Sequence, residues 1–501
     1  MRKQATRPHG LLKTRRDMKE PVFSKQLIKE HSPRFYAAVF LLSALFALFT
    51  VSHFPYTYRS MEADGLWLLT HDFWMQKLAT PPSLTLWLTD YLLQWFGTPC
   101  LAAVCHATVL FLLTIFAHIW LLRLFPARKA VGWIALLPGA IIVGYCTLEF
   151  HMFLETMFLF ALLVAHTFIR HTRLRLLFTL LMLPIGYTLM SMPLLGMMLA
   201  GMIAAEWKHF KTRNWLYSMI TGYAILYLLP IVYSATVAFV PFERRYTCFN
   251  SYFQPINSKA VKDLERLRSY ITLANEGKWS ELLYTHHCKD EAQRGDAIAL
   301  RFALLAESEL GSLPENLPYY PISEEEQFYF PHIREYMTTQ FNRLFYEHLG
   351  VYDEAFHQSQ EFGLLQFNGI CFSSLRQMTE YSIREGEWEV ADKYLKILEK
   401  SSCHAKFVAE KRQEMAQAKK NLRRSIPLRA DNFVGGYPLP YEMLRLCRYY
   451  KGGPYGKKML DYTLCSFLLR GDKRSFLQIY KWHGYYTDKN LPETYKAFLQ
   501  N

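Results

Sequence analysis

Hydrophobic residues are concentrated in the first half of the chain. Residues 98–122 contain no Lys, Arg, Asp or Glu over 25 positions, whereas about 20 apolar residues are enough for a helix to cross a bilayer core. Further apolar runs occupy residues 35–54, 130–148, 151–169, 174–190, 193–206 and 215–240. The pattern therefore predicts about seven membrane-spanning helices in residues 35–240, and a polar region after them.

Basic residues divide unequally between the loops of this region. The leader 1–34 and the turns 123–129, 170–175 and 206–213 together carry 19 Lys and Arg, whereas the alternate loops 55–97, 149–150 and 191–192 carry only Arg59 and Lys77. Short loops rich in Lys and Arg stay in the cytoplasm. We therefore expect a cytoplasmic leader (1–34), an external loop (55–97) and a multi-pass protein of the cell inner membrane.

Residues 174–206 decide on which side the polar half emerges. The segment is basic at both flanks and is interrupted by Pro184, Gly186 and Pro193, so a hairpin of two short helices fits better than one span. Short helices are tolerated in membranes where they are buried against others. With the hairpin, everything after residue 240 is extracytoplasmic, or periplasmic.

The polar half has the pattern of paired helices, so the predicted fold class is all-α. Residues 241–257 form a linker, and from residue 258 onward apolar positions recur at helical spacing. Four segments place a glycine between two helical stretches, at Gly277, Gly350, Gly386 and Gly471. The 36 residues from Gly350 to Gly386 are close to the tetratricopeptide period of 34. We therefore expect a tetratricopeptide-like array of α-hairpins in 258–501, with a generic set of hairpins as the alternative. Such arrays bind protein partners.

The external loop contains the first candidate site, at Glu62 and Asp64. Two carboxylates beside the end of a span can act as a general base or hold a divalent cation. The alternative is a solvated acidic helix end. Further along, an apolar stripe predicts a helix over residues 83–96 that lies on the membrane interface, with Leu84, Trp87, Leu88, Tyr91, Leu92 and Trp95 on one face.

Two further groups of polar residues lie next to predicted spans. His151 and Glu155 are one helical turn apart, beside Glu149, and an ionisable residue inside a span indicates function. The alternative is a hydrogen-bonded pair that packs the bundle. Arg244 and Arg245 follow the last span and either meet a lipid phosphate or simply flank the membrane.

Composition excludes several classes of protein. The chain is 51% hydrophobic and 20% charged, with a net charge of +14. About half of this charge lies in the leader, where it sets topology and contacts anionic membrane lipid, so we expect no nucleic-acid partner. The sequence has no Walker A, GxGxxG, GxSxG, HExxH or CxxC motif.

Residues 53–169 resemble the N-terminal module of GT-C-type membrane glycosyltransferases, the Pmt/ArnT-like enzymes that use polyisoprenyl-phosphate sugars. The matching order is a first span, an acidic pair, a Pro-Pro element, an aromatic helix ending in Phe-Gly, a span with a basic exit, and a short turn with an acid opening the next span. The residues concerned are Glu62, Asp64, Pro81, Pro82, Trp87, Phe96, Gly97, Arg123 and Glu155.

The resemblance implies transfer of a sugar from a polyisoprenyl-phosphate donor to an extracytoplasmic acceptor. Glu62 or Asp64 would deprotonate the acceptor, with or without a divalent cation, and the helical half would select it. Donor phosphate would be held by Arg59, Lys77, Arg244 or Arg245, and acceptor or metal by Glu149, His151 or Glu155.

Two departures from the pattern keep a second reading open. Ala63 separates the two acids, and Thr80 stands where a basic residue commonly precedes Pro-Pro. These departures leave open a degenerate, non-catalytic relative of such enzymes. The alternative function is a non-enzymatic membrane-anchored scaffold that presents a tetratricopeptide-like protein-interaction domain. The whole chain is also similar to an uncharacterised bacterial family of multi-span membrane proteins with a tetratricopeptide-like tail.

Overall fold

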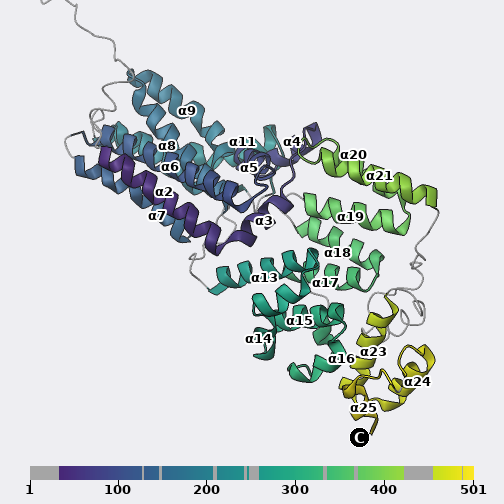
Figure 1. The fold of residues 1–501 in the computed structure, drawn as a ribbon. Coiled ribbons are helices and arrows are strands. Elements are labelled where there is room, and N and C mark those ends of the chain that lie inside the picture. The colour runs from purple at the N-terminus through teal and green to yellow at the C-terminus, as the bar shows by residue number, and fades with distance from the viewer. Residues whose placement is uncertain are drawn as a thin grey trace, which may run out of the picture.

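The computed structural model describes residues 33–126, 129–145, 149–206, 212–241, 245–246, 259–330, 336–365, 370–421, 455–487 and 489–500. These residues form helices and connections, with no strand among them. An apolar helical bundle occupies one part of the molecule and a second helical domain the other (Figure 1). Most of the leader 1–34 and most of the linker 241–257 lie outside the described residues.

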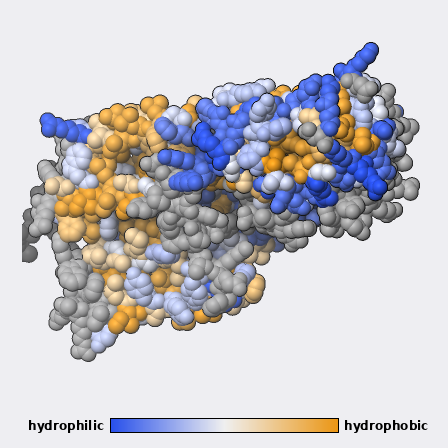
Figure 2. All heavy atoms as spheres, turned by 90° about the horizontal axis from the view of Figure 1, so that it is seen from below, coloured by the Kyte–Doolittle hydropathy of each residue, from blue (hydrophilic) through white to orange (hydrophobic). Residues whose placement is uncertain are grey.

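The bundle contains a helix at each predicted apolar run. They are α2 (Pro33–His53), α6 (Pro99–Leu124), η1 (Lys129–Ala135) continued by α7 (Leu136–Tyr145), α8 (Phe150–Phe168), α9 (Thr172–Leu189), α10 (Met192–Ala205) and α11 (Thr212–Thr236). Within the described parts of the chain, four segments are long and apolar enough to cross a membrane, namely Pro33–His53, Pro99–Leu124, Phe150–Phe168 and Tyr217–Thr236. Hydrophobic residues cover much of the bundle surface in Figure 2, while hydrophilic residues gather over the other domain.

Residues 172–205 fold back on themselves as two helices. α9 and α10 are joined at Met190 and Ser191, and the open end of the hairpin is closed by an ion pair between Arg175 and Glu206. Arg175 also donates from Nε to the carbonyl of Ile169 at the end of α8, at 2.7 Å. The ends of α8 and α10 and the start of α9 therefore meet at one end of the bundle, which is the end with the basic turns.

Three short helices lie between α2 and α6, at the other end of the bundle. They are α3 (Pro55–Asp64), α4 (His71–Leu78) and α5 (Ser83–Leu93). Thr85 of α5 donates to the carbonyl of Leu189 at 2.6 Å, and Tyr233 of α11 donates to the carbonyl of Leu78 at 3.1 Å. The external loop therefore covers the ends of α9 and α11.

The helix predicted over residues 83–96 on the membrane interface packs against other parts of the protein. α5 does form, but its apolar stripe is shared between two cores. Leu84, Leu88 and Leu92 pack on the bundle, whereas Trp87 and Tyr91 pack on a cluster that includes residues of the second domain. A stripe on one face cannot reveal that two different partners divide it.

The second domain is a succession of helical pairs. It contains α13 (Lys259–Asn275), η2 (Glu281–Thr285), α14 (Cys288–Gln293), α15 (Ala297–Leu310), α16 (Leu313–Asn316), η3 (Leu317–Tyr319), η4 (Glu325–Phe328), α17 (Tyr336–His348), α18 (Tyr352–Leu365), α19 (Phe372–Glu385), α20 (Trp388–Leu398), α21 (Ala405–Asn421), α23 (Gly456–Arg470), α24 (Lys473–His483) and α25 (Glu493–Gln500). Neighbours in sequence from α17 to α21 also pack against one another.

The predicted glycine turns are present. Gly277, Gly350, Gly386 and Gly471 all have φ between 68° and 78°, a left-handed conformation that glycine adopts without steric cost. At Gly350 a side chain would also collide with the ring of Tyr455. Each turn reverses the chain between two helices, as the sequence pattern predicts.

A buried arginine ties three of these helices together. Arg343 of α17 pairs with Glu347 at 2.7 Å and donates to Tyr381 of α19 at 3.0 Å and to Asn275 of α13 at 2.6 Å. Since a buried charge without partners is costly, this network fixes α13, α17 and α19 in one arrangement.

Candidate functional site

A buried ion pair lies at the end of the bundle that carries α3, α4 and α5. Lys77 of α4 pairs with Asp90 of α5, and the Lys77 side chain is only 1% exposed. Burial raises the pKa of Asp90, and the positive charge of Lys77 acts in the opposite direction. The ammonium group also lies 5.1 Å from the ring centroid of Phe73. Lys77 is therefore already engaged by a carboxylate inside the protein.

The acidic cluster predicted at the start of α8 lies beside this pair. Glu149 and His151 are 3.7 Å apart at the rim, and buried Glu155 accepts a hydrogen bond of 2.8 Å from the Ser191 amide in the α9–α10 turn. His151 acts electrostatically on both Asp90 and Glu155. The structure thus gathers Lys77, His151 and Glu155 into one polar cluster. Asp90 also belongs to this cluster, although it was not among the predicted site residues. In the sequence it is recognisable only as the single charged residue of an otherwise apolar helix.

The other predicted residues of the external loop lie on α3, which packs against the second domain. Arg59 forms an exposed ion pair with Glu276, the residue that follows α13, at 3.4 Å. Asp64 accepts a 2.6 Å hydrogen bond from Ser373 of α19. Burial raises the pKa of Glu62, and Arg376 of α19 acts in the opposite direction. These side chains therefore face the domain that follows the bundle.

The contact between the first loop of the bundle and the second domain, called the joint below, also includes Glu265 of α13, which sequence reasoning missed. Its carboxylate accepts hydrogen bonds of 2.8 Å from the amides of both Tyr56 and Thr57, and one of 2.5 Å from the Thr57 hydroxyl. These amides lie in the first turn of α3, where donors have no partner within the helix. Arg268 adds a bond of 2.9 Å to Thr57. A residue far along the chain thus caps α3.

Apolar packing completes the joint. After α3, the extended segment from Gly65 runs between α5 and the α19–α21 helices and buries Leu66, Trp67 and Leu68. The Trp67 ring lies 5.3 Å from Trp87 and 5.1 Å from Tyr91. On the other side, the same cluster contains residues of α19, α20 and α21, among them Leu375, Met378, Leu395, Leu398, Val408 and Met415. The external loop is therefore part of the second domain's core.

Of the two arginines predicted after the last span, the structure describes only Arg245. Arg245 donates from Nε to the carbonyl of Val240 at 2.9 Å, and its own carbonyl accepts from Tyr187 at 3.0 Å. It therefore lies beside the C-terminal end of α9. Arg244 lies outside the described residues.

The divalent cation implied by the resemblance does not fit the donors that the structure brings together. Among the described residues, no group of three His, Cys, Asp or Glu side chains is arranged to hold a metal ion. Glu62 and Asp64 instead have Arg376 and Ser373 as neighbours.

Fold and site together define a class of protein. The chain is an all-helical membrane protein whose apolar bundle is joined through its first loop to a second helical domain. It belongs to a family of unknown function, DUF6057, whose model matches residues 31–499. Searches of curated proteins and of solved structures found no match.

Proposed function

We propose that the protein is a membrane-anchored scaffold that carries a tetratricopeptide-like domain outside the cytoplasm as a binding platform for another protein. The bundle crosses the inner membrane seven times in this proposal, with the leader in the cytoplasm. The joint between the external loop and the second domain carries the proposal. Glu265, Asp64 and the buried segment after Gly65 hold the domain against the bundle, which is what a fixed platform requires.

The chain path supports this topology. The ends of α8 and α10 meet at the basic end through Arg175 and Glu206. The α9–α10 turn and the end of α11 lie at the other end, beside Glu155 and Leu78. On α2, side chains such as Phe40 and Leu48 are more than 60% exposed, as expected for lipid-facing positions.

A reporter fusion tests the topology. We expect an enzyme that is active only outside the cytoplasm to be active when fused after residue 250, and inactive when fused after residue 208. Activity in the reverse order would contradict the proposed orientation.

Site-specific photo-crosslinking in cells tests the binding platform. A photoreactive residue at Leu364, which is 65% exposed on α18, should give a discrete protein adduct. The matched control is Leu48 on α2, which is 68% exposed and should give none. If no exposed position of the second domain gives a discrete adduct, the platform proposal fails.

A lipid-linked-sugar transferase remains a second candidate. The raised pKa of Glu62, next to Asp64 at the external end of the bundle, favours it, because a general base works best with a pKa near the ambient pH. The test is Glu62→Gln combined with Asp64→Asn, read out as cell-envelope glycoconjugates. Ser373→Ala is the control, since it removes the partner of Asp64 but keeps both carboxylates. Loss of a glycoconjugate in the double variant alone supports transfer. Unchanged glycoconjugates in the double variant and a deletion strain refute it.

A further inference from the structure

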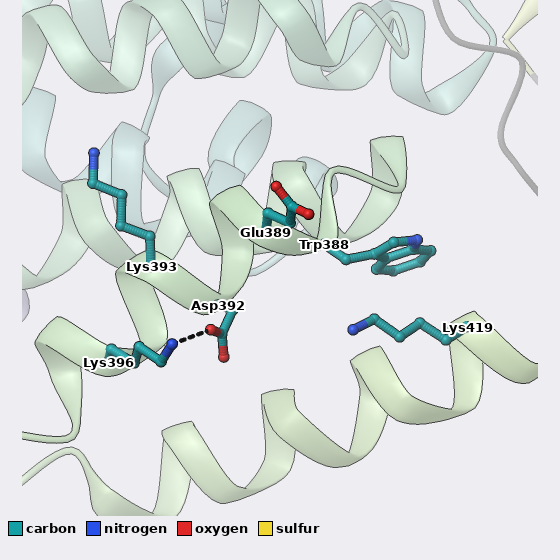
Figure 3. Close-up of a pocket in the computed structure, with 6 residues that line it drawn as sticks. All are labelled: Trp388, Glu389, Asp392, Lys393, Lys396 and Lys419. Carbon is teal, nitrogen blue, oxygen red and sulfur yellow. Dashed lines mark ion pairs between the residues drawn. The ribbon is translucent and has the colours of Figure 1, made fainter.

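The α20–α21 hairpin has an open groove on its outer side. The groove lies between Trp388–Leu398 and Ala405–Asn421 and encloses about 540 Å³. Its lining residues are Trp388, Glu389, Asp392, Lys393, Lys396 and Lys419. Figure 3 shows Asp392, Lys396 and Lys419 reaching into the space between the two helices, with Trp388 beside Lys419.

The groove holds more positive than negative charge. Asp392 at its centre pairs with Lys396 at 2.8 Å and with Arg412 at 2.9 Å. Lys419 adds a third cation, 5.8 Å from the ring centroid of Trp388. The lining therefore holds three lysines, Lys393, Lys396 and Lys419, against two carboxylates, Glu389 and Asp392. Arg412 also pairs with a second carboxylate, Glu399, at 2.6 Å. An anionic ligand would complete the charge balance.

Another face of the second domain is covered by the loop between α2 and α6. α3 packs against α13 and α19, and the segment after Gly65 fills the apolar space between α5 and the α19–α21 helices. None of the residues that line the groove belongs to that contact except Trp388, at its edge. Among the described residues, the joint therefore leaves the groove open.

We propose that this groove binds an extended acidic polypeptide segment of the partner protein. The inference rests on the proposed function and adds the place and the chemistry of the contact. α20 has 11 residues, a length of about 16 Å, which accommodates about five residues of extended chain. Lys396 and Lys419 meet carboxylates of the segment, and Trp388 offers an apolar face. Acidic residues within the groove, such as Glu389, accept from peptide N–H groups and disfavour a uniformly charged polyanion.

Binding to the full chain in detergent micelles tests the proposal. The probe is a fluorescein-labelled peptide of alternating Glu and Ala, measured by fluorescence anisotropy. We expect Lys396→Glu with Lys419→Glu to weaken binding at least about tenfold, because two attractions become repulsions. Trp388→Ala should weaken it by about threefold to tenfold.

The control is Lys406→Glu, which makes the same charge change at a 90% exposed position of α21. It should change the affinity less than about twofold. The proposal is overturned if the peptide does not bind, or if the groove variants bind it as well as the unaltered protein does. It is also overturned if a peptide with Gln in place of every Glu binds equally well. Tighter binding of an oligogalacturonate than of the peptide would overturn it in favour of a glycan.

Crosslinking in cells separates failure of this inference from failure of the proposed function. A photoreactive residue at Lys393, on the groove, should give the same adduct as Leu364, and the charge-reversed groove variant should lose it. An adduct at Leu364 that persists in that variant refutes the groove but leaves the scaffold in place. Absence of an adduct at Lys393 refutes the groove, and absence of adducts at every exposed position of the second domain refutes both.

Discussion

Replacing Glu265 with Ala should loosen the joint between the bundle and the second domain. The carboxylate accepts from the amides of Tyr56 and Thr57 at 2.8 Å each and from the Thr57 hydroxyl. Alanine leaves the first turn of α3 without these acceptors. Neighbouring side chains of α13 cannot replace them, because Arg268, which also contacts Thr57, can only donate.

The expected loss is about 2 kcal/mol. Losing an N-terminal cap costs about 1 kcal/mol, and two further charge-assisted bonds to partly buried donors contribute about 1 kcal/mol each. An opposing contribution of about 1 kcal/mol comes from relief of the carboxylate's own burial, which raises the pKa of Glu265. A net loss of about 2 kcal/mol lowers the equilibrium constant for docking by about 30-fold.

Hydrogen exchange measured by mass spectrometry on the detergent-solubilised full chain is the direct assay. Peptides that contain Tyr56 and Thr57 should exchange about 30-fold faster in Glu265→Ala, while peptides from α13 itself keep their protection. The control is Glu276→Ala, directly after α13, which removes the exposed pair with Arg59 and should cost less than about 0.5 kcal/mol.

Two results would refute this reasoning. If Glu265→Ala and Glu276→Ala have equal effects, the cap does not dominate the joint. If α13 loses protection together with α3, the variant unfolds the domain rather than releasing it from the bundle.

Two further predictions concern the second domain. Burial and the nearby carboxylates Asp353 and Glu387 raise the pKa of Glu385 to about 7, so the folded state retains a proton that the unfolded state releases above about pH 4.5. The free energy of unfolding therefore falls as the pH rises through this window. Glu385→Gln should raise it by about 1–2 kcal/mol at pH ~8, after allowance for partial exposure, and should change it little at pH ~4. Thermal melts at both pH values check this, and an equal stabilisation at both contradicts it. Arg343→Met leaves Glu347 without its buried partner and should cost about 3 kcal/mol in chemical denaturation, whereas Arg376→Met, at an exposed pair with Glu380, should cost less than about 0.5 kcal/mol.

The positions of most helices could be predicted from local sequence. Residues 98–122 predicted a helix that the structure places at Pro99–Leu124, and 151–169 one at Phe150–Phe168. Apolar runs this long have few other stable arrangements in a bilayer. Glycine turns such as Gly386 were equally visible, because a left-handed residue between two helices favours glycine.

The candidate site was only partly predictable, because its contacts join distant positions. His151 and Glu155 are visible as a pair within one helix, but nothing local indicates that Lys77 reaches Asp90 beside them. Glu265 reads as one of several acids on an amphipathic helix, and only tertiary packing brings it to the amides of α3. Glu62 and Asp64 were identified as acids at the end of a span, whereas their position against α19 depends on where a later domain docks.

Because the two domains share a hydrophobic cluster, the second domain should not fold normally without the bundle. Leu66, Trp67, Leu68 and Phe73 belong to the external loop but are buried with residues of α19–α21. Full burial of such side chains is worth about 1.5–3 kcal/mol each, and roughly half of that, about 3–6 kcal/mol in total, concerns the face toward the second domain. Residues 258–501 expressed alone should therefore aggregate or melt at a markedly lower temperature than in the full chain. A polypeptide that places residues 62–75 in front of 258–501 through a flexible linker should recover part of the loss, because it returns the missing side chains. If the isolated domain were as stable as in the full chain, the packing of Trp67 would not contribute to its core, and the joint could not serve as the rigid connection that the proposed function requires.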